Sequence, residues 1–570
     1  MTSREDATAT PPGPNGWWAA WRATRQDDRG AAWRRFGERL EAAGRERAAV
    51  GAYRRAMARD PVDFPSRHRA AALLQGQGET RAAEAIDREL LTINPHDAAA
   101  AAQLGHLLVD RGHTRGYHEA EGLLRRALSL GARRPAVLVP LCQLLAAQER
   151  EEEILALTGE DTEPPILLQR GQAEAALGRF EEARTSFQAV LRQEPENARA
   201  WYHLAGLRLT EGAPAVVGLA DRSEVAGHLA RHAEAAEQPH REWWAFAAAY
   251  ALEEAGDDDA AWAWYGEGNG LVRARVPSNV AAIEAYERRL VATYTPEVLN
   301  HLTRGQLTTP GPAPVFVVGM PRSGTTLLER LIGAHPEAAP LGERADLQEI
   351  MAAMTPNDAS ARQPWPERAA TLAPVAAGSI AGAYLARVHA LAPAGARVAV
   401  DKMPEQFRHI GLIAATMPQA RILHLVRDPR DVGVSCYTAR FHDGLAWSFD
   451  RDSIARRQAS YAAVMAHWRR VLPAGRMLEV PYEGLVRDPE TWVARVLHFL
   501  GLAWEPACVH GHRETAGPVR TSSVAQVRGG ISTASVGRWR RFGEARLGPL
   551  APNGAAPTDH DQTTTIGETQ

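Results

Sequence analysis

The chain has 570 residues, which is too long for one hydrophobic core; we expect about three folding units, although two domains, one of them extended, would also fit. Its 65 Lys and Arg residues against 68 Asp and Glu residues give a net charge of -3, which excludes a strong overall field for nucleic acid or an anionic membrane. Three widely spaced cysteines, Cys142, Cys436 and Cys508, indicate neither a disulfide framework nor a thiolate metal site.

The N-terminal segment, residues 1–30, is polar and has no apolar run of the kind that a signal peptide needs. We therefore expect a cytoplasmic protein. No uninterrupted apolar segment approaches the ~18 residues that indicate a membrane span, so none is predicted.

Residues 31–300 are rich in Ala, Leu, Arg and Glu, and their apolar residues, spaced by three and four, predict amphipathic helices. The region also repeats, because a proline follows 17 residues after Gly44, Gly78 and Gly178. Five residues after these glycines and after Gly256 the chain has alanine, and nine residues after three of the four it has an aromatic residue: Ala49, Ala83, Ala183, Ala261, Tyr53, Phe187 and Tyr265.

Two of these glycines lie 34 residues apart, and this period resembles the tetratricopeptide repeat. An irregular helical bundle would not produce the repeated interval. Between residues 111 and 163 the spacing slips, which indicates inserted or degenerate repeats. The repeats predict an α-helical solenoid whose concave face binds a peptide or protein partner.

Residues 301–313 have the Pro, Gly and Thr content of a linker, and a different pattern follows over residues 314–547. Four β-rich runs alternate with helical stretches there: "PVFVVG", "RVAV", "RILHLV" and "RMLEV". This alternation predicts an α/β P-loop-like domain with a central parallel sheet. The tail, residues 548–570, is polar and is predicted to be disordered.

The first run leads into G-M-P-R-S-G-T-T, from Gly319 to Thr326, which fits the P-loop pattern except that Thr325 stands in place of lysine. Backbone N–H groups and a helix N-terminus can bind an anion there. The hydroxyls of Ser323, Thr325 and Thr326 and the fork of Arg322 add donors. The missing lysine argues against nucleotide hydrolysis, and a purely structural turn is the alternative.

Each of the other three runs also ends on a polar or cationic residue: Lys402, Arg427 and Tyr482. In an open parallel sheet, ligands bind outside the carboxyl ends of the strands. We therefore expect these side chains and the loop to share one site.

Four stretches together are more specific than any one of them: "PRSGTTLLERLIGAHPEAAPLGE", "DKMP", "LVRDPRDVGVS" and "TSSVAQVRGGISTASVGRWRRF". They resemble the sulfotransferases that use 3′-phosphoadenosine 5′-phosphosulfate, in particular tyrosylprotein sulfotransferases and bacterial proteins that join such a domain to tetratricopeptide repeats. The resemblance covers about residues 314–542. It implies this nucleotide as sulfuryl donor, a hydroxyl acceptor and no metal.

Carried onto this chain, the resemblance implies a 5′-phosphosulfate loop at Arg322, Ser323, Gly324, Thr325 and Thr326. It places the 3′-phosphate on Arg427 and Ser435 and a nucleotide contact on Tyr482. A loop from Ser523 to Arg538 would close over the donor, with Ser522 as an alternative contact to Ser523. Arg538 stands where the animal enzymes have lysine.

The resemblance also implies Glu343 as the general base, whereas small-molecule sulfotransferases use a histidine from another segment. Lys402 and Arg322 are the candidate cations for the leaving phosphate. Alternatively, Glu343 only pairs with Arg344 or Arg322 at the surface. We interpret His335 as a helix-end residue, and the charges of "RDPRD" after Arg427 as turn and cap residues.

The acceptor could be a peptide or protein tyrosine, a saccharide or a small natural product, and His442, Asp443 and Trp447 are candidates to line its site. Two other functions stay open at this point. One is a P-loop kinase, which would need the missing lysine and a magnesium-binding acid. The other is a repeat scaffold with an inactive nucleotide-binding domain.

Overall fold

The computed structural model describes residues 30–110, 114–132, 134–208, 221–238, 240–354, 364–441, 443–510 and 531–550. The chain divides into two compact units, residues 1–175 with 181–194, and residues 176–180 with 195–570. In the described ranges, no helix is both long and apolar enough to cross a membrane.

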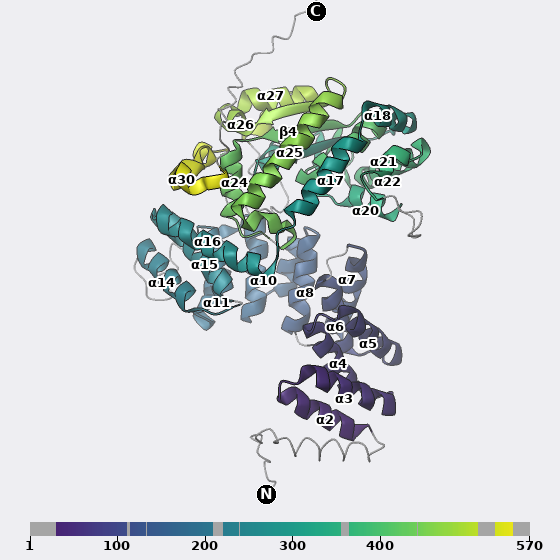
Figure 1. The fold of residues 1–570 in the computed structure, drawn as a ribbon, viewed down its shortest axis with the longest axis vertical. Helices are drawn as coiled ribbons and strands as arrows, with labels where there is room; N and C mark the ends of the chain where they lie inside the picture. Colours follow the sequence, from purple (N-terminus) through teal and green to yellow (C-terminus); the bar gives the residue numbers. More distant parts are fainter. Residues whose placement is uncertain are drawn as a thin grey trace, which may run out of the picture. The chain divides into compact units, whose positions relative to one another are not determined.

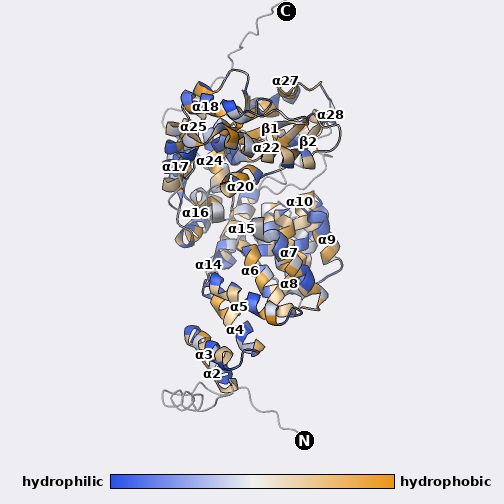
Figure 2. Ribbon diagram, turned by 90° about the vertical axis from the view of Figure 1, so that its right-hand side faces the viewer, coloured by the Kyte–Doolittle hydropathy of each residue, from blue (hydrophilic) through white to orange (hydrophobic). Residues whose placement is uncertain are grey.

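The first unit is built of helices packed in antiparallel pairs, of which α2 to α7 are easily followed in Figure 1. Their orange and blue stretches in Figure 2 reflect amphipathic sequences. The helices are α2 (Ala31–Ala42), α3 (Glu46–Arg59), α4 (Phe64–Gly76), α5 (Thr80–Ile93), α6 (Ala98–Asp110), α7 (Thr114–Ser129), α8 (Arg134–Ala147), α9 (Glu151–Thr158), α10 (Pro164–Leu177) and α11 (Phe180–Gln193).

The predicted repeat positions have the expected structural roles. Gly44 and Gly78 end one helix of a pair with positive φ angles of 69° and 77°, which a glycine adopts without strain. Tyr53 is fully buried, and a Cβ added to Gly37 would lie 2.6 Å from its ring. The tetratricopeptide-like helical architecture is therefore confirmed.

The second unit begins with helices as well and continues into the sheet domain. The helices are α12 (Ala198–Gly206), α14 (Arg222–Ala235), α15 (His240–Ala255), α16 (Asp258–Arg275), α17 (Val280–Thr293) and α18 (Pro296–Leu302). The segment predicted as a linker is packed against the domain, since Leu307 N–H donates to the Thr416 carbonyl at 2.8 Å. A Cβ added to Gly305 would lie 1.8 Å from the Pro374 carbonyl oxygen.

The sheet has five parallel strands in the order β2-β3-β1-β4-β5. The strands are β1 (Ala313–Gly319), β2 (Ala338–Pro340), β3 (Val398–Asp401), β4 (Arg421–Val426) and β5 (Met477–Pro481). The predicted parallel sheet is confirmed with all four predicted strands. The short β2 is an addition, because its three residues, Ala-Ala-Pro, carry no strand signal.

Both faces of the sheet are covered. Phe316 and Val318 of β1 pack in one core with α22 (Pro374–Leu391), α23 (Ile410–Thr416) and α25 (Arg451–Val471). On the opposite face, alternate β1 residues pack with α19 (Thr325–Gly333), α26 (Tyr482–Arg487), α27 (Pro489–Leu500) and α28 (Ala507–His510). The remaining elements are α20 (Asp346–Ala353), α21 (Arg368–Thr371), α24 (Pro429–Tyr437), α30 (Glu544–Leu547), η1 (Thr303–Gly305), η3 (Pro404–His409), η4 (Asp443–Phe449), η5 (Thr533–Ser535), η6 (Arg538–Phe542) and η7 (Gly548–Leu550).

Candidate active site

The loop between β1 and α19 has an unusual backbone. Arg322 has a φ angle of 70°, a left-handed conformation that costs energy for a residue with a side chain. Gly324, the N-cap of α19, has a φ angle of 106°. A Cβ at Gly324 would lie 2.5 Å from the ring of Tyr482, so only glycine fits beneath that ring. Such a strained turn before a helix N-terminus is typical of an anion-binding loop.

Ser323 and Thr325 turn inward in this loop, with 1% and 5% of their surfaces exposed. The Ser323 hydroxyl has no hydrogen-bond partner among the residues that the structure describes, although it is buried. A buried hydroxyl without a partner is costly, so a bound anion is a fitting partner for it.

Arg322 joins the loop to α24. Its Nε donates to the Ser435 hydroxyl at 2.8 Å. Burial lowers the pKa of the Arg322 guanidinium to about 10, which leaves it a cation at neutral pH. Two residues that lie 113 positions apart in the sequence are thus brought together at the end of the sheet.

Arg427 follows β4 and lies 4.5 Å above the ring of Tyr482. Its two terminal nitrogens donate to backbone carbonyls, those of Arg322 at 2.8 Å and Ser535 at 2.6 Å. The Nε atom is buried and has no partner within the described ranges. Arg427 is therefore held by the loop and by the C-terminal segment (residues 531–550), and its Nε–H can still donate to a ligand.

Lys402 and Glu343 meet because they follow neighbouring strands. Lys402 comes directly after β3, and Glu343 comes three residues after β2, which pairs with β3. Lys402 Nζ lies 2.6 Å from Glu343 Oε1, with side-chain exposures of 5% and 43%. Arg344, the alternative partner considered for Glu343, instead contacts Asp346 at 2.7 Å.

Glu329 of α19 was not predicted as a site residue. Its buried carboxylate accepts from Gly342 N–H at 2.8 Å and lies 4.0 Å from Lys402 Nζ. It thereby fixes the turn that carries Glu343. The signal that could have revealed it is a glutamate in the apolar face of "TTLLERLIG".

Asp401 is a second acid behind Lys402. It is fully enclosed and accepts from the Tyr384 hydroxyl at 2.7 Å. Burial raises the pKa of Asp401 to about 7. Lys402 therefore directly follows a buried acid whose pKa is raised.

The other candidates are placed as follows. Asp428 caps α24 by accepting from Arg430 N–H, which agrees with its interpretation as a cap residue. His335 contacts the Ala503 carbonyl beside the end of α19. Trp447 is buried in a core with 1% exposure.

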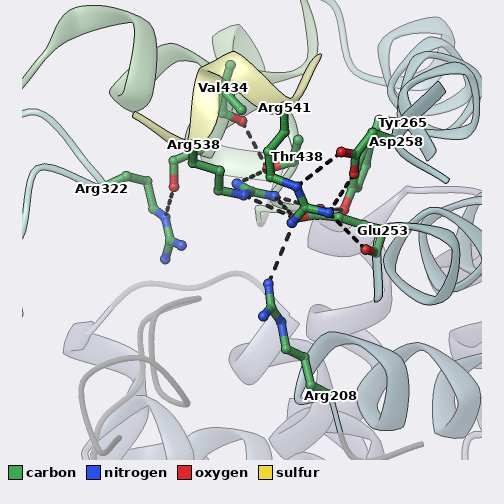
Figure 3. Close-up of polar contacts among 10 residues, drawn as sticks. Arg208, Glu253, Asp258, Tyr265, Arg322, Val434, Thr438, Arg538 and Arg541 are labelled. Carbon is green, nitrogen blue, oxygen red and sulfur yellow. Dashed lines mark hydrogen bonds and ion pairs between the residues drawn. The ribbon is translucent and has the colours of Figure 1, made fainter. Parts of the chain in front are cut away.

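His442, Ser522 and Ser523 lie outside the described residues. The Arg538 guanidinium contacts Glu253 at 2.6 Å and Thr438 at 3.0 Å (Figure 3). Its charge, after burial, also helps to lower the pKa of the Arg322 guanidinium in the loop. Among the described residues, no cluster of three or more His, Cys, Asp or Glu side chains is arranged to hold a metal ion.

Parts of this chain are similar to known proteins. Residues 314–506 match the sulfotransferase family, and residues 164–207 match the tetratricopeptide repeat. An uncharacterized protein of Aquifex aeolicus is 34% identical over 307 residues, which are 52% of this chain and 39% of that protein. Protein-tyrosine sulfotransferase 1 of Danio rerio is 27% identical over 222 residues, 37% of this chain and 59% of the relative.

Among solved structures, the sulfotransferase domain of the Synechococcus PCC 7002 olefin synthase is 23% identical, with a TM-score of 0.29, and the match covers 43% of this chain and 96% of that domain. The chain spans less than two thirds of the length of the two curated relatives named above. The matched segments confirm the resemblance drawn from the motifs: the C-terminal part of this chain carries a domain of the sulfotransferase family, preceded by tetratricopeptide repeats.

Proposed function

We propose that the protein is an enzyme that moves a sulfuryl group from 3′-phosphoadenosine 5′-phosphosulfate to an acceptor hydroxyl. The observation that carries this proposal is the convergence of two contacts at one edge of the sheet. Arg322 binds Ser435, and Lys402 binds Glu343, both within the segment that matches the sulfotransferase family.

The loop and Arg427 are suited to the two anionic ends of this donor. The Ser323 hydroxyl, which has no partner among the described residues, and the N-terminus of α19 offer donors for the 5′-phosphosulfate. We assign the 3′-phosphate to Ser435 and to Arg427, whose Nε has no partner in the part of the chain that the structure describes. Tyr482 would contact the nucleotide beside them.

When bound, the donor supplies an activated sulfuryl group on a phosphate leaving group. Lys402, whose side chain is 5% exposed, provides positive charge where negative charge develops. The Glu343 carboxylate lies 2.6 Å from this ammonium group, and 43% of its side chain is exposed, so an acceptor hydroxyl can reach the carboxylate. Its carboxylate accepts the proton of that hydroxyl as the new S–O bond forms.

For the acceptor we propose a tyrosine of a peptide or protein. Support comes from relatives named protein-tyrosine sulfotransferases in fish, bird and insect, at 26 to 27% identity. Tetratricopeptide repeats usually bind their partners on a concave face, and we propose that the peptide or another protein binds there. A saccharide or a small natural product is the alternative acceptor.

Nucleotide binding tests the donor assignment. The protein should be stabilised against thermal unfolding far more by 3′-phosphoadenosine 5′-phosphate than by ATP with magnesium at the same concentration, because only the former carries a 3′-phosphate. Equal or greater stabilisation by ATP would favour the P-loop kinase and contradict this proposal.

A further inference from the structure

In the second unit, a glutamate of helix α15 lies among arginine side chains of the C-terminal segment. Glu253 of α15 is 5% exposed and contacts the guanidinium groups of Arg538 at 2.6 Å and Arg541 at 3.3 Å. It also accepts from the Tyr265 hydroxyl at 2.7 Å (Figure 3). Burial alone would raise the pKa of Glu253, but the charge of Arg538 and these hydrogen bonds hold it below its ordinary value.

Glu253, Tyr265 and Arg538 form a triad in which the glutamate contacts both a tyrosine hydroxyl and an arginine. A triad of the same kind occurs in the first unit. Glu41 lies 12 residues before Tyr53, as Glu253 lies 12 residues before Tyr265, and its carboxylate also accepts from the tyrosine hydroxyl, at 2.8 Å. The arginine of that triad is Arg69, which belongs to α4, the first helix of the next repeat. In the α15–α16 pair, this place is taken by an arginine of the C-terminal segment.

Apolar contacts also join the C-terminal segment to the α15–α16 pair. Trp262 of α16 packs against Phe542 with ring centroids 4.9 Å apart, and both belong to a core that also includes residues of α24. Two further ion pairs join the segment to the start of α16, Arg541 with Asp258 at 2.6 Å and Arg546 with Asp259 at 2.8 Å. The C-terminal segment therefore packs on this repeat as a following helix would.

The segment held in this way reaches the predicted donor site. Three residues before Arg538, the Ser535 carbonyl accepts from Arg427 at 2.6 Å. Asp431 of α24 accepts from the backbone N–H groups of Gly537 at 2.6 Å and Trp539 at 3.0 Å. The orientation of Arg427 thus depends on where the segment lies.

We infer that Glu253 is a positioning residue for the donor site: by holding Arg538, it fixes the Ser535 carbonyl that orients Arg427 toward the donor's 3′-phosphate. This inference rests on the proposed function, because that function assigns the 3′-phosphate to Arg427. Under this inference, the α15–α16 pair contributes to the sulfotransferase site, while the other repeats remain available to bind a partner.

The test is calorimetric titration of the full chain with two nucleotides, 3′-phosphoadenosine 5′-phosphate and adenosine 5′-phosphate, which lacks the 3′-phosphate. Glu253→Gln should weaken binding of the first about tenfold or more and leave the second nearly unchanged, since a charge-assisted contact is lost only on the 3′ side. The matched control is Glu41→Gln, which removes the same contact from the other triad and should change neither affinity.

Arg538→Gln should repeat the selective loss, and the double variant should lose little more than the larger single loss, because both changes remove one contact. Equal loss for both nucleotides, or no loss for either, would overturn the role of Glu253. If Glu253→Gln does not fold, Arg538→Gln carries the same test. Failure of the wild-type protein to prefer the 3′-phosphorylated nucleotide would instead overturn the proposed function.

Discussion

At the scale of single residues, the pairing of Glu343 with Lys402 is the arrangement on which the proposed chemistry depends. The almost fully buried Lys402 side chain holds the Glu343 carboxylate at a position that remains partly exposed. Glu329 shares the same ammonium from the buried side. One cation can thus serve both the proposed base and the departing phosphate.

Replacing Glu343 should separate catalysis from donor binding. Glu343→Ala is expected to lower kcat by ~100- to 10,000-fold, the usual effect of losing a general base, while the affinity for 3′-phosphoadenosine 5′-phosphate changes little. Steady-state kinetics with labelled donor and titration with the nucleotide measure the two quantities. Glu337→Ala, which only loses an exposed pair with Arg397, is the control. Turnover at the wild-type rate in Glu343→Ala would show that another group takes the proton.

At the scale of elements, the β1–α19 turn combines a left-handed Arg322 with a left-handed Gly324 that lies under Tyr482. The side chain of Tyr482 in turn supports Arg427. The loop and the 3′-phosphate side of the site are therefore coupled through one aromatic ring.

A methyl group at Gly324 should disturb this coupling. Gly324→Ala is expected to weaken binding of 3′-phosphoadenosine 5′-phosphate by about tenfold or more and to cost about 1 to 3 kcal/mol of stability, because it adds backbone strain and displaces the Tyr482 ring. Gly395→Ala is a matched control, since Gly395 has a φ angle of 91° but open space around it. It should lose stability and keep its affinity. Unchanged affinity in Gly324→Ala would contradict the account of the loop.

Much of this arrangement could be predicted from sequence, because strand ends in a parallel sheet converge at one edge. That rule applied to Arg322, Lys402 and Arg427 without any knowledge of the fold. It could not reveal β2, whose three residues have no strand propensity. The partner of Arg538 was equally hidden, because Glu253 lies 285 residues away.

At the scale of the whole molecule, the segment predicted as a linker, residues 301–313, does not separate two compact units. The compact unit that holds the sheet also holds α12 to α18. Helices α15 and α16 share a core with α24 and the C-terminal segment. Such long-range packing leaves no local signal in the sequence, because the residues around Trp262 and around Phe542 do not indicate that these two side chains contact each other.

The central claim is sulfuryl transfer, and the most direct measurement is mass spectrometry of the products formed by the full chain from a cell extract and isotopically labelled 3′-phosphoadenosine 5′-phosphosulfate. The account predicts labelled sulfate esters on acceptor hydroxyl groups, with tyrosine-containing peptides among them, and their loss when Arg427→Ala replaces the wild-type protein. If the protein binds the donor but no labelled esters form in the extract, the account is contradicted.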